Sequence, residues 1–367
     1  MINGPLCFIC GSNLESDYSS ATDDIKEILG VSNQPNDINI IIETGGTTKW
    51  NMGSSYLDGA TSIPKDQLGR WHVAGKKLVK DSFISQADMS ATNTYKSFLQ
   101  WGLENYPADK TGVILWNHGG GVDGVCFDDN FNNGYGSLLN SEMKSAHSSV
   151  ITSGKLEFIG FDACLMQNME IADFNSSYFN YQVASQESEN GDGWYYTGWI
   201  DDLYANKATT VILQEICDQF ISKEGGNQTL SYLNLSYAST FKTAWESYAG
   251  ALKSKLSSGS VSGRTFATWV KSNVKKFGDE GYLGFGQFDV KNFVSKCQGN
   301  SSYAVDSSYA TAVNNSLTNF IAYSRKGSSA GQANGLSCTY RVNDDVSYTS
   351  SETGFSTWLS FNNSYHY

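Results

Sequence analysis

The sequence has few of the features that would connect it with nucleic acid, membranes or metal ions. Its 25 Lys and Arg residues are outnumbered by 37 Asp and Glu residues, which gives a formal net charge of −12. This balance argues against nucleic acid and anionic membranes as partners and suits cationic ligands. No apolar run approaches the roughly 20 residues that a membrane span needs. With 40% hydrophobic and 17% charged residues, the chain has the composition of a folded globular protein.

Proline and histidine are also scarce, with four of each among 367 residues. The scarcity of proline and the many Ser, Asn and Tyr residues favour a protein exposed to an outside environment. Residues 1–4 lead directly into an apolar segment without a signal peptide, and a chain whose leader had been removed would look the same. We therefore expect a secreted or cell-surface protein whose leader is absent from this sequence.

Seven cysteines are scattered along the chain, and they indicate neither a metal site nor a redox pair. Cys7 and Cys10 lie three residues apart on a predicted strand, which places them on opposite faces. The cysteines without a partner at metal-ligand spacing are Cys126, Cys217, Cys297 and Cys338.

Buried strands and amphipathic helices alternate over the first two thirds of the chain, which predicts an α/β fold with a mostly parallel sheet covered on both faces. The predicted strands are 5–10, 39–43, 112–116, 158–164, 181–184 and 230–237, and the predicted helices are 21–29, 91–105, 138–147 and 209–223. Lys49-Trp50 and residues 70–73 resemble short antiparallel strands and predict a side hairpin at the sheet edge.

The pattern changes near residue 240, where helical segments follow one another at 239–256, 262–277, 288–297 and 306–323. A strand at 336–342 and a helix containing Trp358 close the chain. We therefore expect an α/β domain over residues 1–240 and a mainly helical C-terminal region over residues 241–367 packed on it.

The stretch FIGFDACLMQNMEIADF, residues 158–174, carries the strongest candidate for chemistry. It predicts a buried strand that ends at Cys164 and a helix that begins at the next residue. A thiol there would lie at the carboxyl edge of the sheet, where open α/β folds build their sites. The partial positive charge of the helix N-terminus would favour the thiolate.

His118 is the best candidate for a partner of Cys164. It follows the buried strand 112–116 and precedes Gly119, Gly120 and Gly121, so it belongs to the same sheet edge. Amide N–H groups of Gly119 and Cys164 could form an oxyanion hole. A glycine-rich turn beside a structural cysteine is the alternative. The other three histidines are at 72, in a strand-like segment, at 147, where a solvated helix face is expected, and at 366, near the end.

Asp162 lies two residues before Cys164 on the predicted strand, so both side chains should point to one side. Its negative charge would raise the pKa of the thiol unless a cationic substrate group neutralised it. Asp162 therefore predicts a basic substrate residue just before the cleaved bond. Asp192, in a loop after the next strand, is a candidate second wall of that pocket, with an exposed turn as its alternative.

The segments LWNHGGG (115–121) and GFDACLMQNMEIA (160–172) resemble the clostripain family of cysteine peptidases, within the caspase, gingipain and legumain clan. Weaker similarities occur at residues 43–50, 70–73, 184–187, 191–196 and 355–361, so the resemblance spans nearly the whole chain. It implies a caspase-like αβα sandwich, His118 as general base, Cys164 as nucleophile, and cleavage after Arg or, less often, Lys. Asp162 matches the acidic substrate-binding position of the family, and Asp192 and Ser185 lie in looser matches to the substrate-binding loops.

Members of this family often cut themselves between the His and Cys motifs. In this chain, that interval has no Arg and only Lys144 and Lys155. We expect Lys144 to lie in a helix and Lys155 to abut the catalytic strand. Either Lys144 is cut after local opening or the protein works as a single uncut chain, and we favour the uncut chain. We also expect a monomer. Some members need calcium, but Asp123, Asp128 and Asp129 lack the ligand spacing of an EF-hand, and a solvated loop is the better interpretation.

Two functions remain open at this point. The first is a secreted Arg- or Lys-specific cysteine endopeptidase that needs no cofactor and acts on protein or peptide substrates. The second is a catalytically silent peptide- or carbohydrate-binding module, because the chain has nine Trp and 21 Tyr residues that could form a binding platform.

Overall fold

The computed structural model describes residues 4–278, 285–341, 349–350 and 353–366. Within this part of the chain, ten strands form one sheet in the order β12-β9-β8-β7-β6-β1-β2-β4-β5-β3. The central strands β8, β7, β6, β1 and β2 are parallel, and β9, β12 and β4 join them in antiparallel pairings. The strands of this sheet are β1 (Gly4–Cys10), β2 (Ile41–Gly45), β3 (Leu57–Asp58), β4 (Gln67–Ala74), β5 (Lys77–Ser85), β6 (Thr111–Trp116), β7 (Leu156–Asp162), β8 (Phe179–Ala184), β9 (Thr229–Asn234) and β12 (Ile321–Lys326).

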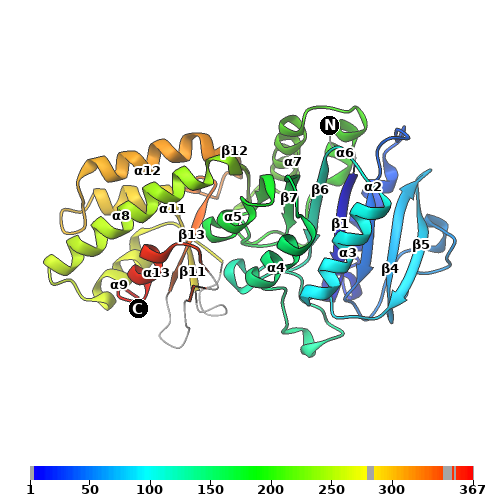
Figure 1. The fold of residues 1–367 in the computed structure, drawn as a ribbon, viewed down its shortest axis with the longest axis horizontal. Coiled ribbons are helices and arrows are strands. Elements are labelled where there is room, and N and C mark those ends of the chain that lie inside the picture. The colour runs from blue at the N-terminus through cyan, green and yellow to red at the C-terminus, as the bar shows by residue number, and fades with distance from the viewer. Residues whose placement is uncertain (1–3, 279–284, 342–348, 351–352, 367) are drawn as a thin grey trace.

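Helices cover both faces of this sheet, as Figure 1 shows. One face carries α3 (Thr92–Asn105), α4 (Asn140–Val150) and α5 (Met169–Asn175), and the other carries α2 (Ser20–Gly30), α6 (Tyr196–Tyr204) and α7 (Thr209–Glu224). On β1, Cys10 packs into the first layer while Cys7 packs into the second, so the two cysteines of the CxxC do lie on opposite faces. Burying large side chains such as Phe8 and Phe98 contributes roughly 1.5–3 kcal/mol each and holds helix to sheet.

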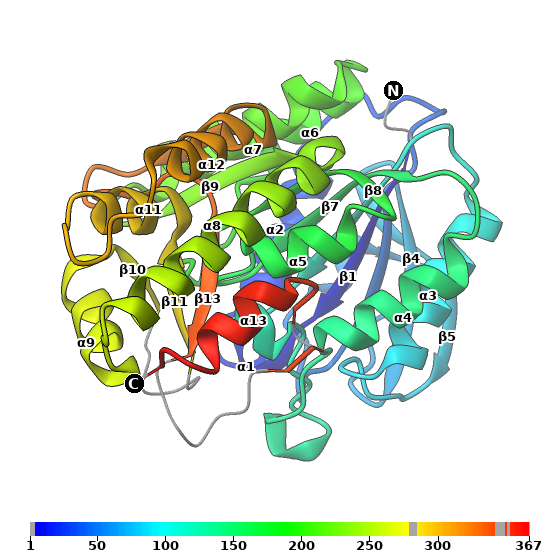
Figure 2. The same cartoon turned by 60° about the vertical axis from the view of Figure 1, so that its left-hand side comes forward.

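The C-terminal part lies beside the sheet and has a second, three-stranded sheet of its own (Figures 1 and 2). Its strands are β10 (Lys276–Phe277), β11 (Phe285–Asp289) and β13 (Ser337–Arg341), and its helices are α8 (Ala238–Ser258), α9 (Gly263–Asn273), α11 (Val290–Gln298), α12 (Ser307–Phe320) and α13 (Ser356–Asn362). An aromatic cluster holds the helices together, with the rings of Trp245 and Trp358 4.9 Å apart. The remaining short helices of the described chain are α1 (Ser12–Ser16), η1 (Ser54–Tyr56), η2 (Gly121–Asp123), η3 (Asn132–Gly134) and η4 (Leu235–Tyr237).

The α/β architecture predicted from the sequence is confirmed, but several elements differ. The hairpin at the sheet edge consists of β4 and β5, so residues 70–73 are in a strand while Lys49 and Trp50 are not. The predicted helices 262–277, 288–297 and 306–323 are each partly wrong, because they overlap β10, β11 and β12 respectively. The overlapping residues pair with neighbouring strands instead of continuing the helices. Residue 342, the predicted end of the last strand, lies outside the described residues.

β12 matters most among these corrections because it belongs to the C-terminal part and yet pairs with β9 of the main sheet. Tyr323 of β12 stacks on Tyr232 of β9, with ring centroids 6.1 Å apart. The main sheet therefore crosses the position near residue 240 at which we expected the domains to divide.

Candidate active site

His118 and Cys164 lie at the same edge of the sheet because their strands are neighbours. β6 and β7 pair in parallel up to Trp116 and Asp162, and the Asn117 amide donates to the Asp162 carbonyl at 3.2 Å. His118 lies two residues beyond the end of β6, and Cys164 lies two residues beyond the end of β7. Both side chains line one open cavity of about 670 Å³.

Cys164 lies in a turn, which corrects the predicted strand end and adjoining helix. β7 stops at Asp162, Leu165 adopts a left-handed conformation (φ 67°), and α5 begins only at Met169. The side chain of Asn168 caps α5 by accepting from the Glu170 amide. The helix N-terminus is therefore too far along the chain to act on the thiol as we expected, since the dipole effect fades within a turn.

Three backbone N–H groups favour the thiolate of Cys164 instead, those of Glu189, Cys164 itself and Gly119. The Glu189 amide donates to Sγ at 3.2 Å. Burial outweighs these donors and raises the pKa of Cys164 above its ordinary value of 9.0, with a smaller contribution from the charge of Asp162. The thiol at rest is thus protonated at neutral pH, contrary to the thiolate predicted from the sequence.

Gly119 is required by the close approach of the two loops. A Cβ at this position would overlap the carbonyl oxygen of Cys164 and would lie 3.1 Å from its nitrogen. The amides of residues 119 and 164 consequently face the same small space beside the sulfur. This is the arrangement that two oxyanion-hole donors need.

The imidazole of His118 is held by a residue that the sequence analysis did not single out. Its Nε2 lies 2.7 Å from Oδ1 of Asn13, which belongs to α1 just beyond β1. Burial lowers the pKa of His118 below 6.5, so the ring is neutral at neutral pH and can accept a proton. Asn13 was detectable in principle, because it is a polar residue placed after a buried strand that neighbours β6.

Asp162 is buried, does not itself line the cavity, and is held by groups from a later segment. The Trp194 amide donates to both of its oxygens at 3.2 and 3.3 Å, and the Tyr196 hydroxyl donates at 2.8 Å. Burial raises the pKa of Asp162 to about 6, despite these donors. No basic side chain of the described chain forms an ion pair with it.

The other two predicted substrate-binding residues lie elsewhere. Asp192 is exposed and lines a separate cavity of about 530 Å³ together with Asp24 and Lys223. Ser185 is fully buried, and its hydroxyl pairs with Thr229 at 3.0 Å and accepts from the Glu187 amide. The structure thus brings His118, Gly119 and Cys164 together but does not bring Asp192 or Ser185 into their cavity.

Two further expectations about polar residues are corrected. His147 is fully buried on α4, where Nε2 lies 2.9 Å from the Tyr95 hydroxyl, so it is not on a solvated face. Asp128 is also buried rather than solvated, and it accepts from the amides of Met89 and Asn130 at 2.8 Å each. Among the described residues, no group of three or more His, Cys, Asp or Glu side chains is arranged to hold a metal ion.

Both lysines between the two motifs lie where the sequence predicted. Lys144 is exposed on α4, and Lys155 immediately precedes β7 with its Nζ donating to the Ser176 carbonyl at 2.6 Å. Within the described residues, no helix has both the length and the apolar character that a membrane crossing requires.

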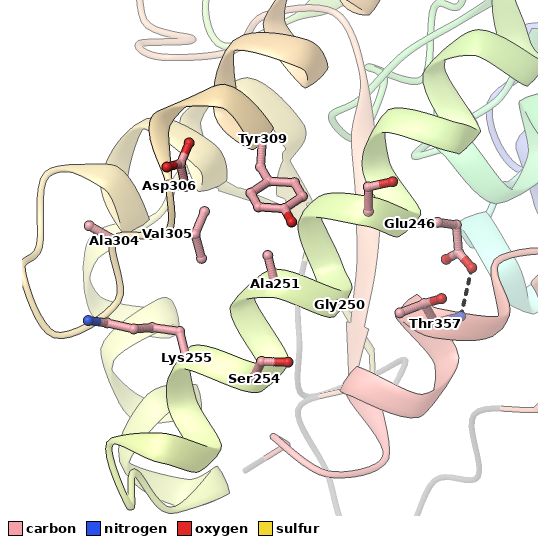
Figure 3. Close-up of a pocket in the computed structure, with 11 residues that line it drawn as sticks. Glu246, Gly250, Ala251, Ser254, Lys255, Ala304, Val305, Asp306, Tyr309 and Thr357 are labelled. Carbon is pink, nitrogen blue, oxygen red and sulfur yellow. Dashed lines mark hydrogen bonds between the residues drawn. The ribbon is translucent and has the colours of Figure 1, made fainter.

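A further cavity, of about 960 Å³, lies in the C-terminal part, and neither Cys nor His lines it (Figure 3). α8 supplies Glu246 and Lys255, and the start of α12 supplies Tyr309. The Glu246 carboxylate accepts from the Thr357 amide at 2.7 Å and thereby secures the start of α13. The lining of this cavity has neither thiol nor imidazole, unlike that of the cavity at the sheet edge.

A mostly parallel sheet between helices, with a thiol, a neutral imidazole and two convergent amides at its carboxyl edge, defines a protein of the αβα class with a Cys-His site. The family model of the clostripain family (Peptidase_C11) matches residues 7–363. The chain therefore belongs to the clostripain family.

Individual relatives are distant in sequence. The chain is 26% identical over 178 residues to clostripain of Hathewaya histolytica, an alignment covering 44% of this chain and 33% of clostripain. The chain thus spans about a third of the length of this relative.

Two solved structures share the fold. A secreted C11 cysteine protease from Bacteroides thetaiotaomicron superposes with a TM-score of 0.70 at 16% identity, over 99% of both chains. An inactive zymogen C11 protease from Parabacteroides distasonis superposes with a TM-score of 0.65 at 18% identity, over 93% of this chain and 92% of its own.

Proposed function

We propose that this protein is a cysteine endopeptidase that cleaves peptides after Arg or Lys through the Cys164–His118 pair. The observation that carries this proposal is the convergence of the Cys164 thiol, the His118 imidazole and the amides of Gly119 and Cys164 in one open cavity. Membership of the clostripain family supports it.

The chemistry begins from a neutral pair, because burial lowers the pKa of His118 and raises that of Cys164. His118 accepts the thiol proton as sulfur attacks the substrate carbonyl carbon, and the amides of Gly119 and Cys164 stabilise the oxyanion. The protonated imidazole then donates to the leaving amine, and water attacks the thioester to release the acid product and regenerate the thiol. No cofactor takes part in these steps.

Asp162 supports the preference for a basic residue before the cleaved bond, whose binding site is called the S1 pocket. Its carboxylate is buried and is not matched by a cation within the described chain. Removing one partner from a buried charge pair costs roughly 2–5 kcal/mol, so Asp162→Asn should weaken Arg cleavage by about 30-fold or more. Unchanged selectivity for Arg over uncharged residues in this variant would refute the assignment.

Amidolysis of an Arg-containing reporter peptide tests the catalytic pair. We expect Cys164→Ala to abolish activity and His118→Ala to lower kcat by about 10²–10⁴-fold, the usual contribution of a general base. Cys217→Ala is the matched control, because Cys217 is a buried thiol on α7 far along the chain from the site. Full activity in Cys164→Ala would exclude the mechanism.

Labelling separates the peptidase from the silent binding module. A chloromethyl ketone that carries Arg should modify Cys164 much faster than it modifies the other six cysteines, all of which are buried free thiols. Slow, uniform labelling would favour the binding module instead.

We also propose that the protein acts outside the cell, as a monomer and without a cut between its two motifs. The Bacteroides neighbour is described as secreted, which supports the first point. Lys144 lies within α4 and Lys155 donates to the Ser176 carbonyl, which supports a chain that is not cut between the motifs. Mass spectrometry of the wild-type protein beside Cys164→Ala tests it, since a self-inflicted cut would appear in the wild type alone.

A further inference from the structure

Tyr135 is an exposed aromatic residue at the rim of the cavity that contains Cys164. Its exposed fraction, 78%, is larger than that of any other large hydrophobic side chain in the described part of the chain. A single exposed ring needs no explanation by itself, but Tyr135 lines the cavity together with Phe127 and Asn133 of the same segment. The Cys-His chemistry uses none of these three side chains, so they are free to contact the substrate.

The backbone of a short loop fixes the position of Tyr135. The three residues before it, Asn132, Asn133 and Gly134, have φ angles of 51°, 54° and 75°, so all three are left-handed. Asn and Gly tolerate this conformation better than other residues do. The Gly134 amide donates to the Phe131 carbonyl at 2.9 Å, and the Tyr135 amide donates to the Asn132 carbonyl at 3.1 Å. Figure 2 shows this teal loop projecting from the body of the molecule before α4.

Phe127 places the same segment on the His118 side of the cavity. Its ring lies edge-on to the imidazole, with ring centroids 6.4 Å apart. The Phe127 amide donates to Oδ1 of Asn117 at 2.6 Å, and the Cys126 amide donates to the His118 carbonyl at 3.3 Å. The chain that leads into the loop is therefore attached to the strand end that carries His118.

The proposed chemistry decides which part of the substrate lies on this side. The imidazole of His118 donates its proton to the leaving amine, so the residue after the cleaved bond must lie within its reach. The acyl carbon is held at Cys164, whose neighbour Leu165 also lines the cavity. A side chain after the cleaved bond therefore points toward Phe127 and Tyr135.

The only carboxyl group that lines this cavity belongs to Asp129, within the same segment. A Cβ at Gly134 would lie 3.1 Å from Oδ1 of Asp129, so the carboxyl group adjoins the turn before Tyr135. A negative charge there repels an acidic side chain of the substrate.

We propose that Phe127 and Tyr135 form a subsite for an apolar side chain on the residue immediately after the cleaved bond, with Asp129 disfavouring an acidic side chain there. This inference rests on the proposed cysteine endopeptidase function. It concerns the leaving-group side of the substrate and is separate from the preference for Arg or Lys before the bond. Tyr135 is a specificity-determining residue in this proposal.

Partitioning of the acyl-enzyme measures this subsite separately from the acyl side. The full-length protein is acylated by an Arg ester whose leaving group is a simple alcohol, and an added amino-acid amide then competes with water. The amine nitrogen attacks the thioester carbonyl, the C–S bond breaks, and a proton of the amine passes through His118 to the sulfur. The added amide thus takes the place of the leaving amine. The readout is the ratio of aminolysis to hydrolysis for leucinamide, glycinamide and aspartic acid α-amide.

The wild type should use leucinamide about three- to tenfold better than glycinamide, the range that one aromatic contact supplies. Tyr135→Ala should bring the two within about twofold of each other, because the ring that distinguishes them is lost. Tyr135→Phe keeps the ring and should retain the wild-type ratio. Asp129→Asn should improve the use of aspartic acid α-amide relative to glycinamide.

Tyr309→Ala is the matched control, because Tyr309 is an exposed tyrosine on α12 that lines the cavity of the C-terminal part (Figure 3). Its ratios should equal those of the wild type.

Equal use of leucinamide and glycinamide by the wild type would overturn this inference alone, as would a wild-type ratio in Tyr135→Ala. A Tyr135→Ala variant that instead changes the preference for the residue before Arg in reporter peptides would also overturn it, since the ring would then lie on the acyl side. A wild type that forms no acyl-enzyme from the Arg ester would overturn the proposed function and, with it, this inference.

Discussion

Asn13 shows how a single side chain outside the two sequence motifs can set the state of the catalytic pair. Its Oδ1 lies 2.7 Å from Nε2 of His118, so this nitrogen carries the ring proton in the neutral tautomer and leaves Nδ1 as the acceptor. In the proposed mechanism, Asn13 is a positioning residue, because it contacts the imidazole and not the substrate.

Asn13→Ala should lower kcat about tenfold with little change in KM, since the ring loses its fixed orientation and tautomer. The low pKa of His118 places the acid limb of the pH–rate profile below pH 6.5 in the wild type. Asn13→Asp should move this limb to higher pH, because a carboxylate beside the ring stabilises the imidazolium. An unchanged acid limb in Asn13→Asp would contradict the positioning role.

The position of Cys164 relative to α5 explains why the prediction of a lowered thiol pKa was wrong. The helix after Cys164 suggested a dipole that would lower its pKa, but the turn from Ala163 to Asn168 separates the thiol from α5. Burial then dominates and raises the pKa of Cys164.

At the scale of elements, the turn that carries Cys164 is clamped between the two sheets. Its Gln167 amide donates to the Ser185 carbonyl at 2.8 Å, on the β8 side, and the Ser337 amide of β13 donates to the Gln167 carbonyl at 3.0 Å. Asn168 donates to Oε1 of Gln287 and to Oγ1 of Thr339, each at 2.9 Å. The C-terminal part therefore contacts the turn that carries Cys164 directly, although it supplies no residue of the proposed Cys-His pair.

Asn168→Ala should lower the free energy of unfolding by about 3 kcal/mol, because it removes the cap of α5 and leaves buried partners unsatisfied. It should also lower kcat, since the turn holding Cys164 loses its anchor to β11 and β13. Denaturant unfolding and amidolysis measure the two effects.

Ser262→Ala provides the control for this prediction, because Ser262 caps α9 in an exposed position by accepting from the Thr265 amide. Its loss should cost about 1 kcal/mol and leave kcat unchanged. Equal kcat in Asn168→Ala and the wild type would show that the clamp has no part in catalysis.

For the whole molecule, buried carboxyl groups set an unusual pH dependence of stability. Burial raises the pKa of Glu43 to about 7, even though Arg70 pairs with it at 2.7 Å, and it also raises the pKa values of Asp24 and Glu189 well above their ordinary values. In the unfolded chain these groups ionise near their ordinary values, so above about pH 5 the native state holds more protons than the unfolded state.

Stability should therefore fall as the pH rises from about 6.5 to 8.5. His118 and His147, whose pKa values are lowered, are neutral in both states over most of this window and do not oppose the trend. Thermal unfolding followed by circular dichroism measures it. Glu189→Gln should raise the melting temperature at pH 8.5 more than at pH 6.5, and a wild-type melting temperature that rises across the window would contradict the prediction.

Much of the fold could be predicted because it depends on neighbours in the chain. The apolar runs of β1, β6 and β7 and the amphipathic pattern of α3 each follow from a few consecutive residues. The failures occurred where a distant partner decided the outcome. β12 is a strand because β9 offers it an edge, and Lys49-Trp50 is not a strand because β5 takes the place beside β4.

The sequence by itself determined the α/β class and the placement of His118 and Cys164 at one edge of the sheet, because each follows a buried parallel strand. Tertiary structure alone decided the protonation of the thiol, the contact of Asn13 with His118, the separation of Asp192 from the main cavity and the burial of Glu189 beside Asp162. These properties depend on desolvation and on hydrogen bonds between residues far apart in the chain, and neither follows from local pattern.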